Sequence, residues 1–146
     1  MRALVQRVKR ADVVVDGETV GQIGHGLLIY LGIHKDDDMA KVRYLAPKVA
    51  KLRLFQDDAG KMNRSLIDTG GEALVISQFT LYGDCSSGLR PDFFSAMPAK
   101  EAVLLYESFV SELKREIKRV ETGRFQAYMQ VSSVNDGPVT LMVEAP

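Results

Sequence analysis

Few residues in this 146-residue chain have the types and spacing of a familiar catalytic site. His25 lies between two glycines in a turn, and His34 ends a predicted strand; neither has a carboxylate at the spacing of a metal-binding motif. A serine or cysteine nucleophile would need one of these histidines as its base, and Ser77, Thr80 and Cys85 have none beside them in sequence. We therefore interpret the histidines and Cys85 as structural or surface residues, and we expect no metal and no cofactor.

Gly137-Pro138 is the most unusual local feature of the sequence. It lies within residues 135–140, which read NDGPVT. A peptide bond before proline is usually trans and is cis in a minority of cases. The sequence alone does not fix the isomer, and Gly-Pro is common in turns, so the pair becomes informative only together with other motifs.

Composition and charge limit the classes of protein to which the chain can belong. The chain has 19 basic and 19 acidic residues, which argues against a generic nucleic-acid coat and against a polybasic membrane binder. Its single cysteine excludes a disulfide scaffold and a zinc site built on paired cysteines. The first residues lack the apolar run of a signal peptide, and no apolar stretch has the length of a membrane span. We expect one domain over residues 1–146, located in the cytoplasm.

Hydrophobic periodicity predicts an α+β domain with two amphipathic helices on a mostly antiparallel sheet. The helices are expected over residues 39–52, after the acidic run 36–38, and from about residue 98 to residue 117. A tight turn at Asp16-Gly17 follows an early strand, and the apolar run 27–31 predicts a central buried strand. Further strands are predicted over residues 2–8, 13–15, 20–23, 52–55, 73–81, 125–131 and 139–143, with turns at 56–61 and 68–71 and a loop over 83–97.

Two motifs, taken together, resemble the D-aminoacyl-tRNA deacylases, which are also called D-tyrosyl-tRNA(Tyr) deacylases. Residues 77–81 spell SQFTL, and residues 135–140 spell NDGPVT. Matches at residues 1–8 (MRALVQRV), 60–63 (GKMN), 90–93 (RPDF) and 122–125 (TGRF) extend the resemblance over essentially the whole chain. The resemblance implies a homodimeric, barrel-like hydrolase that cuts the ester between the 3′ end of tRNA and a D-amino acid, or glycine mischarged on tRNA(Ala). Such an RNA-binding enzyme proofreads translation by removing D-residues from tRNA.

The resemblance also implies an active site at the dimer interface, where the SQFTL strand of one subunit meets the Gly-Pro motif of the other. In the family the Gly-Pro peptide is cis. The carbonyls of Gly137 and Pro138 would then occupy the space that an L-side chain needs and would reject that enantiomer by a clash. Arg7 matches a family arginine that would hold this motif in place.

The same resemblance assigns catalysis mainly to the main chain and to the substrate. The N–H of Phe79 would stabilise the oxyanion, Gln78 would position the ester, and the terminal ribose 2′-OH of the tRNA would assist. Thr80 would be a polar residue of the pocket, and Ser77 would contact the substrate. Met129 would lie near the pocket for the terminal adenine.

The residues alone leave alternatives open. Gln78 and Thr80 could be ordinary polar residues of a strand, and Met129 could be a core methionine. A non-catalytic RNA- or protein-binding module and a conventional serine or cysteine esterase are the rival functions. Family members commonly carry lysines ahead of the Gly-x-Arg-Pro segment, whereas residues 85–90 here read CSSGLR. This difference removes positive charge that could meet the tRNA acceptor end.

Overall fold

One long strand organises the sheet. In the computed structural model, which describes residues 1–146, β1 (Arg2–Val15) pairs antiparallel with β3 (Gly26–Gly32) through its first half and with β2 (Glu18–Ile23) through its second half. Its other edge pairs antiparallel with β8 (Gln130–Glu144) along almost its whole length. The predicted strands 2–8 and 13–15 are therefore one element. The tight turn is confirmed: Asp16 and Gly17 both have positive φ, as a type I′ hairpin turn requires.

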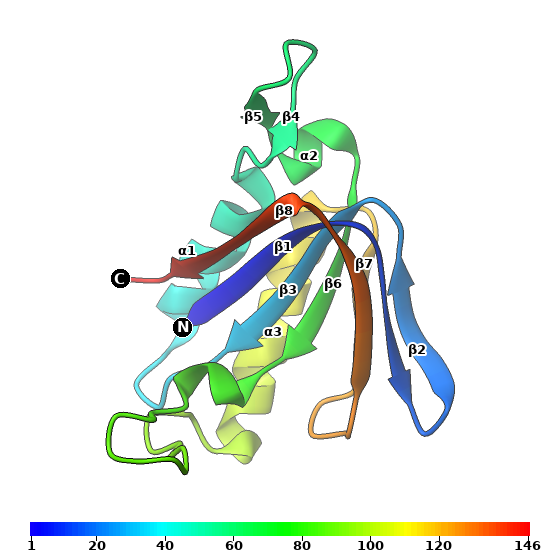
Figure 1. Ribbon diagram of the computed structural model, residues 1–146. Coiled ribbons are helices and arrows are strands. Elements are labelled where there is room, and N and C mark those ends of the chain that lie inside the picture. Colours follow the sequence, from blue (N-terminus) through cyan, green and yellow to red (C-terminus); the bar gives the residue numbers. More distant parts are fainter.

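Two neighbouring strand pairs at one side of the sheet are parallel, so the sheet is mixed, while its pairing is mostly antiparallel as predicted. β6 (Glu72–Ser77) runs parallel to β3, and β7 (Val120–Thr122) runs parallel to β6. Each of these pairs is joined by a helix that crosses over the sheet, and a crossover connection is what parallel pairing requires. The α+β class is confirmed, with a strongly curled, nearly closed mixed sheet of order β2-β1-β3-β6-β7 and β8 on the far edge of β1 (Figure 1).

Both predicted helices are present and cover the same face of the sheet (Figure 1). α1 (Met39–Lys51) begins after Asp38, whose side chain accepts hydrogen bonds from the N–H groups of Ala40 and Lys41. α3 (Ala99–Glu116) begins after Pro98. The larger apolar core lies between these helices and the sheet, and a smaller cluster fills the concave face with Val8, Ala11, Val13, Ile23, Leu28, Leu74 and Ile76.

Between α1 and β6 the chain forms short elements that the sequence did not resolve. β4 (Phe55–Gln56) and β5 (Met62–Arg64) make a small hairpin, so the predicted strand 52–55 is shorter and later than expected. The predicted turn at 68–71 is the end of α2 (Leu66–Thr69), a single turn closed by reciprocal hydrogen bonds between Ser65 and Asp68.

Two further predictions are wrong, and both concern segments that bear on function. The strand predicted over 73–81 ends at Ser77, and η1 (Phe79–Tyr82) is a 3-10 turn. The alternation of apolar and polar residues continues past Ser77. However, β3 ends at Gly32 and β7 pairs with β6 only as far as Val75, so the residues after Ser77 have no neighbouring strand to pair with. At the carboxyl end, residues 125–129 of the predicted strand 125–131 form a loop, and one strand, β8 (Gln130–Glu144), joins the last two residues of that prediction to the predicted strand 139–143. Residues 135–138 form an irregularity within β8 that shifts its register against β1.

No helix combines the length and the apolar character needed to cross a membrane.

Candidate active site

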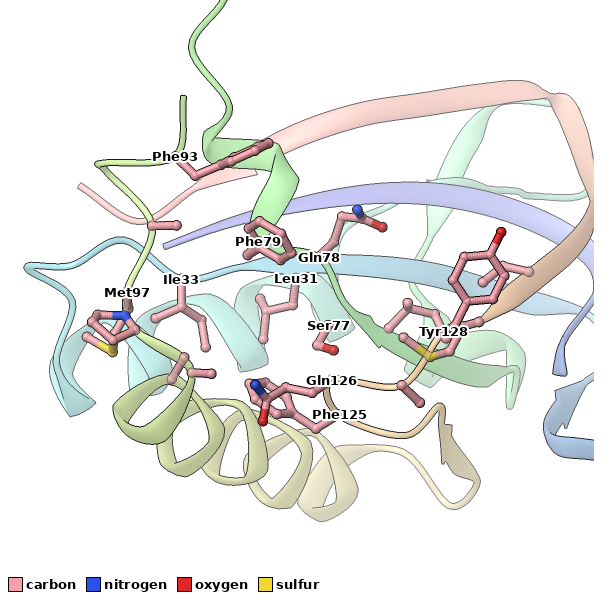
Figure 2. A pocket seen from close by; sticks show the side chains of 18 residues that line it. Leu31, Ile33, Ser77, Gln78, Phe79, Phe93, Met97, Phe125, Gln126 and Tyr128 are labelled. Carbon is pink, nitrogen blue, oxygen red and sulfur yellow. The ribbon is translucent and has the colours of Figure 1, made fainter. Parts of the chain in front are cut away.

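A cavity of about 630 Å³ opens where β3 and β6 end. Its walls are η1, the loop before α3, the start of α3 and the loop 125–129, as Figure 2 shows. Fourteen of its eighteen lining residues are hydrophobic, and none carries a formal charge. The volume lies within the range of small-molecule sites, and the lining suits a flat, neutral ligand.

Ser77, Gln78 and Phe79 line this cavity, so the structure brings three of the SQFTL residues together there. The N–H of Gln78 donates to the carbonyl of Leu31 at 2.8 Å, and the N–H of Leu81 donates to the carbonyl of Gln78 at 3.3 Å. Gln78 is therefore the corner at which β6 turns into η1. Thr80 is exposed and does not line the cavity, but its hydroxyl accepts a short hydrogen bond from Nε2 of Gln78.

The turn at Gln78 begins with main-chain N–H groups that have no acceptor within the turn, and of its first two residues only Phe79 lines the cavity. Phe79 and Thr80 are the first residues of η1, and the first N–H groups of a helix have no acceptor within that helix. The ring of Phe79 is 58% exposed and packs edge-to-face against Phe93, with ring centroids 5.0 Å apart. The polar groups available to a ligand are thus side-chain amides and hydroxyls together with main-chain N–H groups.

Met129 lies on the opposite wall, in the loop 125–129. A Cβ on Gly123 would collide with Sδ of Met129, so the absence of a side chain at Gly123 leaves room for this methionine. The sequence did not identify Phe93, Phe125 or Tyr128, which also line the cavity. For Phe93 and Phe125 the signal was the RPDF and TGRF matches, whereas the strand predicted over residues 125–131 gave no signal for Tyr128.

The Gly-Pro motif does not reach this cavity within one chain. The Gly137–Pro138 peptide bond is cis. Gly137 neighbours Arg7, which pairs with Leu27 at the start of β3, whereas Ser77 pairs with Leu31 at its end. Leu27 and Leu31 are four residues apart in an extended strand, so the Gly-Pro motif and the cavity lie about 13 Å apart along β3 alone.

Arg7 contacts the Gly-Pro segment directly. It is only 7% exposed, and its Nε donates to the carbonyl of Asp136 at 3.2 Å and lies 3.4 Å from Oδ2 of the same residue. Its Nη1 donates to the carbonyl of Leu54 at 2.7 Å. The guanidinium therefore links the segment before Gly137 to the start of the β4–β5 hairpin.

The histidines and the cysteine lie outside the cavity. His25 packs against Phe55, and His34 packs against Tyr82 beside a second, smaller hollow. Burial, together with Asp37, raises the pKa of Tyr82 to about 12. Cys85 is exposed in the loop after η1, and no three His, Cys, Asp or Glu side chains gather as metal ligands. The cavity therefore contains no imidazole, thiol or carboxylate to act as a base.

Comparison with known proteins gives a consistent result. The model of the family described as D-Tyr-tRNA(Tyr) deacylase matches residues 4–144. A D-aminoacyl-tRNA deacylase of Thermosipho africanus is 54% identical over 99% of this chain and 97% of its own length. One of Heliobacterium modesticaldum is 56% identical over 99% of this chain and 96% of its own length.

Two solved structures are similar over nearly their whole length. A structure titled c-Myc DNA Unwinding Element Binding Protein has a TM-score of 0.93 and 42% identity, covering 100% of this chain and 99% of that one. A structure described as a probable eukaryotic D-amino acid tRNA deacylase has a TM-score of 0.87, covering 99% and 98% of the two chains. At 16% identity, the second likeness shows the fold alone.

Proposed function

The chain belongs to the D-Tyr-tRNA(Tyr) deacylase family and is a D-aminoacyl-tRNA deacylase, a hydrolase, and we propose how its site performs this reaction. The substrate is the ester that joins a D-amino acid to the 3′ end of tRNA, and also glycine mischarged on tRNA(Ala). Water cleaves the ester, and the products are the free amino acid and a tRNA with its 3′-hydroxyl restored. The aminoacyl-adenosine end of the tRNA occupies the cavity, with the adenine beside Met129.

The observation that carries this proposal is an uncharged cavity lined by Phe79, whose main-chain N–H has no acceptor within η1. An esterified amino acid has no free carboxylate, and the cavity has no cation that would bind one. The ester is already activated, so a strong side-chain nucleophile is not required. Ser77 contacts the substrate, and Gln78, held by its hydrogen bond to Thr80, positions the ester.

Catalysis then depends on the charge that develops on the ester carbonyl. When water adds to this carbonyl, its oxygen becomes an oxyanion, and the N–H of Phe79 donates to it. Such a donor acts strongly where little water competes. As the carbon–oxygen bond to the ribose breaks, the neighbouring 2′-OH of the substrate passes its proton to the departing 3′-oxygen, and the 2′-oxygen takes up the proton that the attacking water loses.

Chiral selection requires a second copy of the chain. Gly137 and Pro138 lie far from the cavity of their own subunit, so their carbonyls act on the cavity of the partner subunit in a homodimer. There they fill the space that an L-side chain needs, whereas the hydrogen of glycine or a D-side chain points elsewhere. Arg7 holds the motif through its hydrogen bond to the carbonyl of Asp136.

Phe79→Pro tests the main-chain donor, because proline at the first position of a helical turn removes only the N–H and the ring. Phe79→Ala removes the ring and keeps the N–H. We expect Phe79→Pro to hydrolyse D-Tyr-tRNA about 10²- to 10³-fold more slowly than Phe79→Ala. Equal rates would contradict the oxyanion role. Release of no amino acid by the unmodified protein would favour a binding module, and loss of activity in Ser77→Ala, Thr80→Ala or Cys85→Ala alone would favour an esterase nucleophile.

A subunit-mixing experiment tests the shared site. Phe79→Pro impairs the cavity and Gly137→Ala impairs the chiral motif, each in its own homodimer. A mixed dimer has one cavity with both changes and one with neither. After the two variants are unfolded and refolded together in equal amounts, neither cavity of a mixed dimer should hydrolyse L-Tyr-tRNA, so we expect an L-rate below the average of the two separate variants. An L-rate equal to that average would contradict the exchanged arrangement.

A further inference from the structure

The side chain of Tyr128 has no structural role within the chain. It is 88% exposed, although it lines the cavity. Its hydroxyl makes no hydrogen bond to the protein, and its ring stacks on no other aromatic ring, unlike Phe79 and Phe125. In Figure 2 the ring rises from the loop 125–129, and its hydroxyl points away from α3. A bare aromatic surface is thus placed at the mouth of an apolar cavity.

The backbone around Tyr128 is held on both sides. The N–H of Ala127 donates to the carbonyl of Arg124 at 3.2 Å, and Gln126 adopts a positive φ of 63° within this turn. Met129 packs against the concave core cluster. The ring is therefore presented from a fixed main chain, which lowers the entropy lost when a ligand orders it.

We propose that the ring of Tyr128 is a stacking platform for the nucleobase of the nucleotide that precedes the terminal adenosine. This inference rests on the proposed function, in which the terminal adenosine occupies the cavity. The next nucleotide must then leave through the mouth, where the ring stands. Unpaired nucleobases stack on exposed aromatic side chains regardless of base identity. Arg124, immediately before this loop, is exposed and forms no ion pair within the chain, so its guanidinium is available to a phosphate.

Two substrates distinguish the contribution of this subsite to hydrolysis from the contribution of the cavity. D-tyrosyl-CCA trinucleotide carries the preceding nucleotide, and the D-tyrosyl ester of adenosine lacks it. We expect Tyr128→Ala to lower the ratio of kcat/KM on the trinucleotide to kcat/KM on the adenosine ester by about 5- to 150-fold. Tyr128→Phe should restore the ratio, because it keeps the ring. Phe94→Ala is the matched control, because Phe94 is 84% exposed and does not line the cavity.

An unchanged ratio in Tyr128→Ala would overturn the proposal, whether both substrates lose activity equally or neither does. Binding of uncharged CCA trinucleotide and of adenosine gives a second test that does not depend on hydrolysis. Tyr128→Ala should weaken binding of the trinucleotide by a similar factor relative to adenosine. Hydrolysis of neither ester by the unmodified protein would contradict the proposed function, and the binding measurement would still decide the role of Tyr128.

Discussion

Replacing Arg7 by methionine should disturb the Gly137-Pro138 segment more than the rest of the fold. Methionine fills similar space but donates no hydrogen bond. The variant loses the 2.7 Å bond to the carbonyl of Leu54, the 3.2 Å bond to the carbonyl of Asp136 and the ion pair with the Asp136 side chain. The segment then keeps its strand pairing, which is irregular at that point, and the hydrogen bonds of the Asn135 side chain to Thr140 and to the N–H of Val139.

The size of the effect follows from these contacts. Hydrogen bonds to a charged group contribute about 1.5–3 kcal/mol each, so two give a gross loss of about 3–6 kcal/mol. The loss is offset because a buried charge no longer has to be desolvated, and because the Asp136 side chain, 32% exposed, can be hydrated. We expect the free energy of unfolding to fall by about 2–4 kcal/mol, as measured by urea denaturation.

The functional readout is the ratio of hydrolysis rates on D-Tyr-tRNA and L-Tyr-tRNA. Misplacement of a positioning group by about 1 Å can change a rate about 10²-fold, so we expect this ratio to fall at least about tenfold in Arg7→Met. Arg119→Met is the control, because Arg119, like Arg7, binds both carboxylate and carbonyl oxygens, here those of Glu72, Glu121 and Gln22, but at the β2–β7 side of the sheet. It should lower stability and leave the ratio unchanged. Lower stability of Arg7→Met with an unchanged ratio would refute the positioning role.

Three further changes test individual contacts. Gly137→Ala should lower the free energy of unfolding, measured by urea denaturation, by about 1–3 kcal/mol and should raise hydrolysis of L-Tyr-tRNA. The reason is that φ at Gly137 is +123° and that the added Cβ would lie 2.9 Å from Nη2 of Arg7. Gly60→Ala is the control for backbone strain alone, because a Cβ at Gly60 would have no atom within 4 Å. Tyr106→Phe should cost about 0.5–1.5 kcal/mol, because the hydroxyl donates to the carbonyl of Val75 at 2.8 Å. Burial raises the pKa of Tyr106. The contribution of the Tyr106 phenol to stability is therefore present below about pH 10, where the unfolded phenol is neutral, and is lost at higher pH. Tyr106→Phe should make the free energy of unfolding fall less steeply at alkaline pH. Hydrogen bonds to the capping carboxylate lower the pKa of Asp68, so its contribution is present above its ordinary pKa and is lost in acid; Asp68→Asn should flatten the acid fall.

The sequence predicted elements well where one local pattern determines them. Residues such as Val42, Leu45 and Val49 recur at helical spacing and are all fully buried, so α1 was predicted almost to its ends. The strand that ends at Ser77 was overextended because Phe79 and Leu81 continue the alternation. Whether a ladder partner exists there depends on where β3 and β7 end, and a window of local sequence does not contain that information.

The candidate site was predicted from motifs rather than from periodicity. The motifs named Ser77, Gln78 and Met129, which the structure brings to one cavity. They could not show that Thr80 turns outward, because this follows from the change from strand to 3-10 turn at Gln78. They gave no role to Tyr128, whose exposure is a property of the folded surface.

The main-chain donor at the start of η1 has a consequence for how this protein tolerates mutation. A backbone N–H belongs to whichever amino acid occupies position 79, and only proline lacks it. Codons for phenylalanine and proline differ at both of their first two bases, so no single-base change can delete this group. A single-base change in that codon can therefore change the side chain at the rim of the cavity, but the backbone hydrogen-bond donor is kept in every case.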